Sequence, residues 1–292
     1  GISCNRQISA DDLKEKPADV TRSTVHKSVV VIARKPIFGP IREKLAVITR
    51  AFFEQGDFSD LSLIDNLYDN LNVMFDTQLD ENDMYVGMSL RELIFHMKNN
   101  VLVLFKALLL EKKIIFYSKN TENLCSSQFS LVSLVPALLE HLEDSCSPLL
   151  HKYEDTVKKP LSLKSSDRNS LLRFMGLPLQ PFSEGGMFNP YLPLQQFNKV
   201  NAPETKYFLV GSTNSLIVES CECDLVVKFD QGIVEFKDNN LKKALALSTN
   251  DKKWMDYITQ SVVETWDPKD PWKPKGLGFH GSEDFVRQQF ED

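Results

Sequence analysis

The stretch "LFKALLLEKKIIFYS", residues 104–118, places a long apolar run next to a charged cluster. A transmembrane helix needs about 20 mostly apolar residues. This run is too short for that, because Lys106 interrupts it and charged residues 111–113 end it. Residues 104–110 are apolar nearly all round, as in a buried helix, and residues 114–117 are a β-branched and aromatic run of strand length. The stretch therefore predicts a helix, a charged turn and a buried strand, and it does not span a bilayer.

The residues before this stretch predict strands followed by helices. Residues 1–8 alternate between apolar and polar side chains, as in a half-buried strand. Residues 23–35 contain a strand that is long and apolar enough to be central in a sheet. Apolar residues then recur at helical spacing from Ile41 to Phe53, with Pro40 at the helix start, and again over residues 61–75. We expect a small α/β layer over residues 1–78.

The pattern changes after an acidic segment at residues 76–85. Ser89 and Glu92 have the spacing of a capping box that opens a helix over residues 90–98. Residues 127–143 predict another helix, kinked at Pro136. Helix, strand and helix in succession favour an α/β fold whose mainly parallel sheet has helices on both faces. Residues 143–170 are polar and rich in Ser and Lys, which predicts a long surface loop suited to phosphorylation.

The C-terminal half continues with short elements. Residues 206–214 predict a strand that ends in a turn, and residues 215–238 carry further strand-like runs. Residues 241–266 return to helical spacing, and the last residues begin an amphipathic helix.

Composition limits the classes of function. The chain has 292 residues, 42% hydrophobic and 25% charged, which is typical of a globular protein of roughly two domains. With 34 Lys and Arg against 40 Asp and Glu, its net charge of −6 argues against broad binding of nucleic acid. The five cysteines are too sparse for a disulfide scaffold and favour a reducing compartment. The start has neither a signal peptide nor an initiator Met, so we expect a fragment of a longer chain.

No pattern for covalent or metal chemistry is found. The turn "VGSTN", residues 210–214, lacks the P-loop and dinucleotide-binding motifs, so Gly211, Thr213 and Asn214 are interpreted as a tight turn after a strand. Cys221 and Cys223 have no second ligand pair for zinc and are interpreted as strand cysteines that face opposite sides of a sheet. The five histidines are scattered, and the acidic pairs are interpreted as solvated loop charge. We therefore predict no catalytic residue, no cofactor and no metal ion, and a function in recognition.

Several of these segments together resemble one family. The blocks are "GISCNRQI" (1–8), "SVVVIARKPIFGPIREKLAVITRAFFEQGDFS" (28–59), "VLFKALLLEKKIIFYS" (103–118), "LVSLVPALLEHL" (131–142), "GLPLQPF" (176–182), "PYLPLQQ" (190–196) and "YFLVGSTN" (207–214). In this order they resemble the late-secretory-pathway Avl-nine proteins, a branch of the DENN superfamily. The resemblance implies three modules: a longin-like module at 1–78 that lacks its opening strands, a central DENN module at 79–230, and the start of a helical module at 231–292.

The resemblance also implies a function. Proteins of this branch are associated with Golgi-to-plasma-membrane export, recycling endosomes and cell migration. They act in the cytoplasm, peripherally on Golgi, vesicle or endosome membranes. Many DENN proteins are guanine-nucleotide exchange factors for Rab-type small GTPases, a reaction driven by tighter binding to the nucleotide-free GTPase. Three hypotheses follow: a trafficking protein that binds other trafficking proteins, an exchange factor for a Rab-type GTPase, and a GTPase effector.

The family-motif residues are expected to be mainly structural. They are Phe105, Glu111, Lys112, Tyr117, Gly211, Thr213 and Asn214. Apolar patterned segments usually belong to cores, so the helix and strand of the opening stretch are expected to pack in the central sheet. The alternative is that Lys112 or Lys113, in the turn, contacts a partner.

Overall fold

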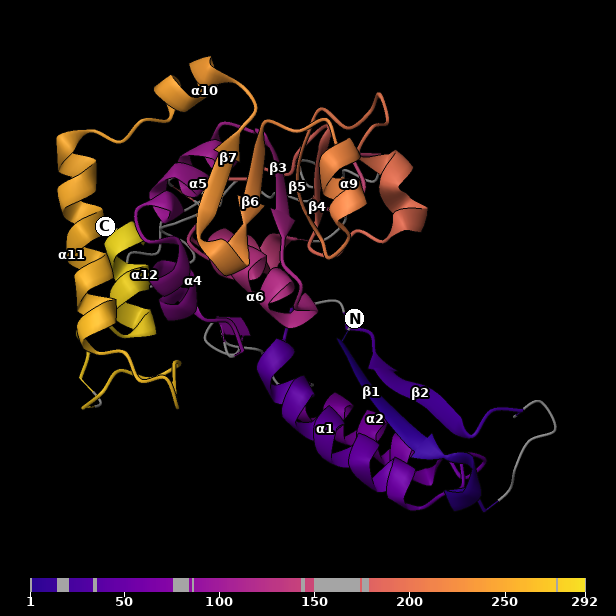
Figure 1. The fold of residues 1–292 in the computed structure, drawn as a ribbon. Coiled ribbons are helices and arrows are strands. Elements are labelled where there is room, and N and C mark those ends of the chain that lie inside the picture. The colour runs from indigo at the N-terminus through magenta and orange to yellow at the C-terminus, as the bar shows by residue number, and fades with distance from the viewer. Residues whose placement is uncertain are drawn as a thin grey trace. The chain divides into compact units, whose positions relative to one another are not determined.

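The structure is a computed structural model that describes residues 2–14, 21–33, 36–75, 84–85, 87–142, 145–149, 174, 179–276 and 278–291. The chain divides into two compact units, Gly1–Gly87 and Met88–Asp292. Figure 1 labels the elements of both. Most of the predicted surface loop at 143–170, and the acidic segment at 76–83, lie outside the described residues.

The first unit is a two-stranded antiparallel sheet with two helices. Strand β1 (Ile2–Ser9) pairs with β2 (Thr24–Val31), from Ile2 opposite Val31 to Ser9 opposite Thr24. Helix α1 (Phe38–Glu54) packs on both strands, and α2 (Ser62–Phe75) packs on α1. The two strands and both helices predicted for this part of the chain are confirmed. The central position predicted for the second strand is wrong, because β2 pairs only with β1 in a two-stranded sheet of the described residues and Val29 is its one buried residue.

The apolar periodicity of α1 and α2 builds the core of the first unit. Alternate residues of β1 are half-buried, which matches the predicted period of two. Phe52, Phe53 and Phe58 pack together at centroid distances of 5.2–6.3 Å, and Phe53 meets the other two rings edge to face. The buried residues of this core are Val29, Ile37, Ile41, Leu45, Phe52, Phe53, Leu67 and Leu71.

The second unit is built on a mixed five-stranded sheet. Its strands are β3 (Lys113–Tyr117), β4 (Gly186–Asn189), β5 (Tyr207–Ser212), β6 (Leu225–Lys228) and β7 (Ile233–Phe236). They are ordered β4-β5-β3-β6-β7 across the sheet. All neighbours are parallel except β6 and β7, which are antiparallel. The prediction of an α/β fold with a mainly parallel sheet is confirmed.

Helices cover both faces of this sheet. Val210 of β5 packs with Ile217 of α9 (Ser215–Ser220) in one core cluster. The next residue, Gly211, points to the other face, where Leu124 and Gln128 of α6 (Thr121–Val132) lie. Because neighbouring residues of a strand face opposite sides, α9 and α6 cover opposite faces, as Figure 1 shows.

Residues 104–118 form the end of a helix, a turn and a strand, as predicted. Helix α5 (Asn100–Leu109) is buried over Val101–Leu104, and the three central residues of β3, Ile114, Ile115 and Phe116, are fully buried. Strand β3 occupies the centre of the sheet, so it needs apolar side chains on both faces. Just before α5, Ser89 caps α4 (Leu90–Met97), because its hydroxyl accepts the N–H of Glu92 at 3.0 Å.

Two element predictions are wrong. No kinked helix runs through Pro136: α6 ends at Val132, and only a 3-10 turn (Leu138–His141) follows. The end of α6 has a physical cause, since the ring of Pro136 would clash with the carbonyl four residues earlier. The run at 215–220 is helix α9 rather than strand, because Asn214 caps it by accepting the N–H of Leu216 at 2.9 Å.

Three helices follow the sheet. They are α10 (Asn239–Ala244), α11 (Thr249–Glu264) and α12 (Glu283–Glu291). A complete capping box of Ser248 and Asp251 opens α11. Both α11 and α12 pack against α4 within the second unit. The assignment of longin-like and DENN modules, with limits at residues 78 and 230, stays a prediction.

Arg91 joins α4 to the C-terminal segment. Its side chain is fully buried. Its guanidinium donates to the carbonyls of Thr265 (2.9 Å), Pro271 (3.0 Å) and Gly281, and to the hydroxyl of Thr265 (3.0 Å). It also lies over the ring of Trp266, 5.7 Å from the centroid. One side chain therefore connects residues almost two hundred positions apart.

Glu283 of α12 makes the matching contact at the start of α4. Its carboxylate accepts the hydroxyl of Ser89 (3.1 Å) and the N–H groups of Leu90 (2.8 Å) and Arg91 (3.2 Å). Since the first N–H groups of a helix have no partner within it, an acceptor at this point stabilises α4 and fixes α12 to it.

Candidate partner-binding groove in the first unit

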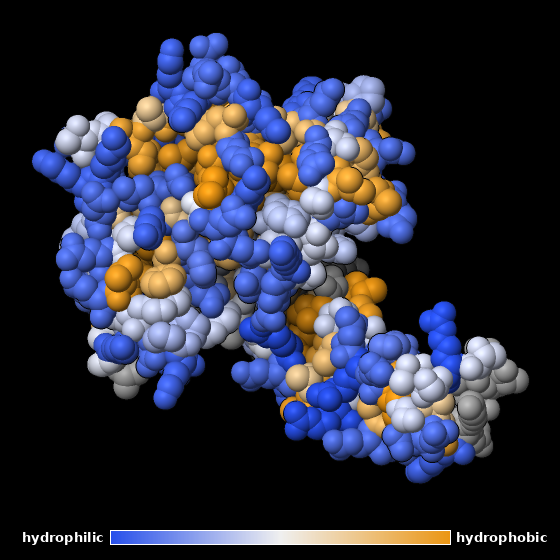
Figure 2. All heavy atoms as spheres, viewed as in Figure 1, coloured by the Kyte–Doolittle hydropathy of each residue, from blue (hydrophilic) through white to orange (hydrophobic). Residues whose placement is uncertain are grey.

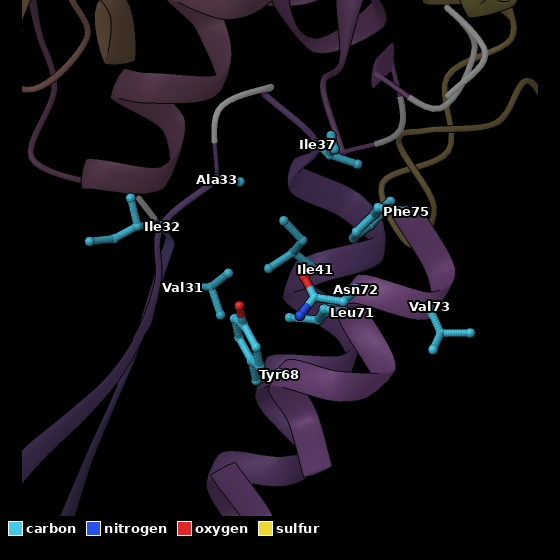
Figure 3. A pocket seen from close by; sticks show the side chains of 10 residues that line it. All are labelled: Val31, Ile32, Ala33, Ile37, Ile41, Tyr68, Leu71, Asn72, Val73 and Phe75. Carbon is cyan, nitrogen blue, oxygen red and sulfur yellow. The ribbon is translucent and has the colours of Figure 1, made fainter. Parts of the chain in front are cut away.

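An apolar groove lies between the end of β2 and α2. One side is formed by Val31, the last residue of β2, and by the two residues that follow it. The other side is formed by Ile37 and Ile41 at the start of α1 and by residues 68–75 of α2. The groove has a volume of about 680 Å³. Figure 3 shows Tyr68 and Leu71 pointing from α2 into the space beside Val31, whereas Val73 points away from it.

The groove has a buried floor and an exposed rim. Ile37, Ile41 and Leu71 belong to the core of the unit and form the floor. The rim is open to solvent: Ile32 is 87% exposed and Tyr68 67%. Figure 2 shows hydrophobic residues at the surface of the first unit among hydrophilic ones. Exposed apolar clusters bordered by polar residues are typical of sites that bind other molecules.

Few polar groups line the groove among the described residues. In that part of the chain, the hydroxyl of Tyr68 and the amide of Asn72 are the polar side-chain groups of the lining. Helix α2 carries exposed Asp65 and Asp69 and contains no Lys or Arg. The described lining of the groove is thus mainly apolar, and the exposed charges of α2 are negative.

The groove was missed by the sequence analysis. The pattern of α2 was interpreted only as one buried face, and the exposed Tyr68 and Val73 fall outside that face. Large apolar side chains on the solvent side of an amphipathic helix are the sequence pattern that could have indicated this groove.

The seven family-motif residues lie in the second unit and do not form one site. Tyr117, Gly211, Thr213 and Asn214 gather at the carboxyl ends of β3 and β5, where Tyr117 is opposite Ser212. Glu111 and Lys112 lie at the other end of β3, in the turn from α5. Phe105 packs on Phe290 of α12, with ring centroids 5.3 Å apart.

The turn from α5 to β3 is held by backbone geometry. Glu111 has a φ of 52°, which lets its N–H bond to Leu108 and lets the N–H of Lys112 reach Ala107 at 3.1 Å. Burial raises the pKa of Tyr207, and the nearby Glu111 carboxylate raises it further, while a hydrogen bond with Ser183 at 3.1 Å opposes the shift. These contacts give Glu111 a local structural role.

The β5–α9 junction is also structural. Asn214 caps α9, and the carbonyl of Gly211 accepts the N–H of Leu192 at 2.7 Å. A Cβ on Gly211 would lie 2.2 Å from Nε2 of Gln128 and 2.3 Å from the carbonyl oxygen of Pro190. Gly211 is therefore required by close packing of β5 against α6 and the segment after β4.

Gly211→Ala is expected to destabilise the second unit by about 1–3 kcal/mol, because overpacking a tight core forces its neighbours to move. Chemical unfolding followed by tryptophan fluorescence measures this loss, since Trp254, Trp266 and Trp272 are all in the second unit. Gly278→Ala is the control, because a Cβ there meets nothing within 4 Å and its backbone does not need a positive φ. Equal stabilities of Gly211→Ala and the parent would contradict the packing argument.

The cysteine interpretation needs correction. Cys221 and Cys223 lie in the segment between α9 and β6, not in a strand. Both pack against the same core cluster instead of facing opposite sides. The physical reason is that extended residues two positions apart point to the same side of the chain.

The described residues offer no metal or membrane-spanning site. Among them, no three His, Cys, Asp or Glu side chains are grouped so that they could hold a metal ion. In the same part of the chain, each helix is too short or too polar to cross a bilayer.

Comparison with known proteins shows which family the chain belongs to. A family model described as "Transport protein Avl9" matches residues 1–292. The Saccharomyces cerevisiae "Late secretory pathway protein AVL9" is 47% identical over 297 residues, covering 100% of this chain and 39% of that protein. The Schizosaccharomyces pombe "Late secretory pathway protein avl9" is 40% identical over 295 residues, covering 100% of this chain and 60% of that protein. The chain thus spans less than two thirds of either relative, and it belongs to the Avl9 transport protein family.

Proposed function

We propose that this chain is part of a trafficking protein of the late secretory pathway that acts by binding other proteins. The names of the two yeast relatives support the pathway. The apolar groove of the first unit, with its buried floor and exposed rim, is the observation that carries the mode of action. It offers surface for recognition and no groups for covalent chemistry.

The partner is a protein that presents apolar side chains flanked by Lys or Arg. The apolar lining of the groove would accept the first, and Asp65 and Asp69 of α2 would attract the second. The proposed location is the cytosolic surface of Golgi, secretory-vesicle or recycling-endosome membranes, with peripheral attachment. A role in cell migration is part of the same proposal.

Ile32→Asp tests the groove. The side chain of Ile32 is 87% exposed, so the change should leave folding intact while placing an unfavourable charge at the rim. In cells depleted of the endogenous protein, the full-length protein with this change is expected to restore secretion of a reporter about 5- to 30-fold less well than the parent, as one lost apolar anchor is worth about 1–2 kcal/mol.

Val47→Asp is the matched control. Val47 is a 67% exposed apolar residue of the same unit that does not line the groove. It should restore secretion fully. Full rescue by Ile32→Asp would remove the groove from the mechanism, whereas normal secretion in the depleted cells themselves would contradict the trafficking role.

A second candidate function is guanine-nucleotide exchange on a Rab-type GTPase. It is supported by the resemblance of residues 103–118 and 207–214 to the DENN superfamily, which is an argument from family. Exchange needs only tighter binding to the nucleotide-free GTPase than to the loaded one. The full-length protein should then bind one nucleotide-free GTPase of a Rab panel and accelerate its GDP release. Preference for a GTP-loaded form would indicate an effector, and no binding across the panel would leave the trafficking scaffold.

A further inference from the structure

The segment Cys221–Glu222–Cys223 brings two thiols to one side of the chain. Cys221 ends α9 in an extended conformation and is buried in the cluster formed by residues of β3, β5, β6 and α9. Cys223 is half-buried and packs against the same cluster. All five cysteines are free thiols. The Cys221–Cys223 pair is thus a dithiol that a single residue separates.

The two thiols are chemically unequal. The interaction with Cys223 and burial both raise the pKa of Cys221 strongly, so this sulfur keeps its proton. The hydrogen bond from Cys221 lowers the pKa of Cys223, and the Lys237 charge lowers it further against the opposing effect of burial. Glu222 and Asp224, next to the thiols, oppose ionisation, and Lys113 favours it. Cys221 is buried and Cys223 is only half-buried, so solvent reaches the Cys223 sulfur first, which is the arrangement of a reactive cysteine with a resolving partner.

We propose that Cys221 and Cys223 form an intrachain disulfide when the protein meets a hydroperoxide. In the first step the Cys223 thiolate attacks one peroxide oxygen, the O–O bond breaks, Cys223 becomes a sulfenic acid, and the other oxygen leaves as hydroxide or alkoxide. In the second step the Cys221 sulfur attacks the Cys223 sulfur and loses its proton, the S–O bond breaks, and water leaves. The two thiols lose two electrons, and the peroxide gains them.

The backbone of the pair takes no part in the strand pairing of β6. Strand pairing resumes only at Asp224, whose N–H donates to the carbonyl of Lys113 at 2.8 Å. The carboxylate of Asp224 accepts the N–H of Lys113 at 2.8 Å and anchors that end of β6. A bridge across one residue departs from relaxed disulfide geometry, so thiols should reduce it readily. The pair is therefore a reversible site, not a structural crosslink.

The other three cysteines differ from Cys221 and Cys223 in thiol pKa, exposure or position. Burial raises the pKa of Cys125 to about 11, which leaves it protonated. Cys146 is exposed, and Cys4 lies in the first unit. The described structure places neither of them in the cluster that holds Cys221 and Cys223.

The test is peptide mass spectrometry of the native chain after dilute hydrogen peroxide, with free thiols blocked before digestion. Trypsin releases residues 207–228 as one peptide that contains Cys221, Cys223 and no other cysteine. We expect this peptide to lose two hydrogens and to escape blocking. A protease that cleaves after Glu222 should split the reduced peptide but leave the oxidised halves joined, and dithiothreitol should reverse the change.

Serine variants separate the two roles. Cys221→Ser should leave a Cys223 sulfenic acid that dimedone traps, whereas Cys223→Ser should leave Cys221 unmodified. Cys146→Ser is the control and should not alter formation of the bridge. If both thiols of the parent remain open to blocking, or if Cys223 oxidises to sulfinic acid with Cys221 intact, the proposal is wrong.

Discussion

Replacing Arg91 with leucine is expected to lower the free energy of unfolding of the second unit by about 3–5 kcal/mol, the range for breaking a buried charged network by removing one partner. Arg91 is fully buried, and its guanidinium satisfies the carbonyls of Thr265, Pro271 and Gly281. Leucine would fill part of the volume and leave these acceptors without donors. Each buried acceptor without a donor costs about 1–3 kcal/mol.

Arg91→Leu should also make α12 less stable. Arg91 contributes a positive charge near the Glu283 carboxylate, and its N–H is one of the three donors to that carboxylate. Without the guanidinium, Glu283 keeps its hydrogen bonds but loses a nearby opposite charge. We therefore expect α12 and residues 265–281 to exchange amide hydrogens faster in Arg91→Leu.

Unfolding in guanidinium chloride, followed by tryptophan fluorescence, measures the change in the free energy of unfolding, because all three tryptophans are in the second unit. Arg91→Lys keeps the charge but lacks the planar set of donors, and it should lose an intermediate amount of stability. Lys252→Leu, which removes an exposed cation of α11, should change stability by less than about 0.5 kcal/mol. If Arg91→Leu is as stable as this control, the buried network does not stabilise the unit.

The second large effect is a pH dependence centred on Glu283. Burial raises the pKa of Glu283 from its usual 4.5 to about 7, against the lowering effects of the N–H groups of Arg91 and Leu90, the Ser89 hydroxyl and the Arg287 charge. The folded state thus binds this proton more tightly than the unfolded state does. Its contribution to stability is complete below about pH 4.5 and is lost as the pH rises through about 7.

The free energy of unfolding of the second unit is therefore expected to fall by up to about 3 kcal/mol between about pH 5 and pH 8, as a shift of one pKa unit corresponds to about 1.4 kcal/mol. Glu283→Gln cannot titrate, so this slope should disappear in the variant, whatever its absolute stability. Glu219→Gln, which changes an exposed carboxylate of α9, should keep the slope of the parent. The same slope in Glu283→Gln as in the parent would rule out Glu283 as its source.

Much of the fold could be read from local patterns. Helix α5 and strand β3 follow from an apolar run that a charged turn divides, and α1, α2 and α11 follow from helical spacing. Errors arose where one local signal overrode another. Pro136 ended a helix that the apolar pattern would have continued, and the Asn214 cap made a helix of a β-branched run.

The candidate sites depended on contacts that local patterns do not contain. Periodicity shows that Leu71 and Ile41 are buried, but the groove exists because the end of β2 leaves Tyr68 and Ile32 uncovered in the described structure. Likewise, Cys221 and Cys223 could be seen as a pair, but their shared contact with one cluster required the fold.

The amino-acid sequence by itself determined the α/β class, the buried strand β3 and the family. Only the tertiary structure decided that Arg91 and Glu283 meet, because these residues are 192 positions apart and a buried polar side chain has no periodic signal. It also decided which apolar faces are covered and which remain open. The physical reason is that a hydrophobic pattern states which side of a segment avoids water, whereas the segment that covers it is chosen by packing across the whole unit.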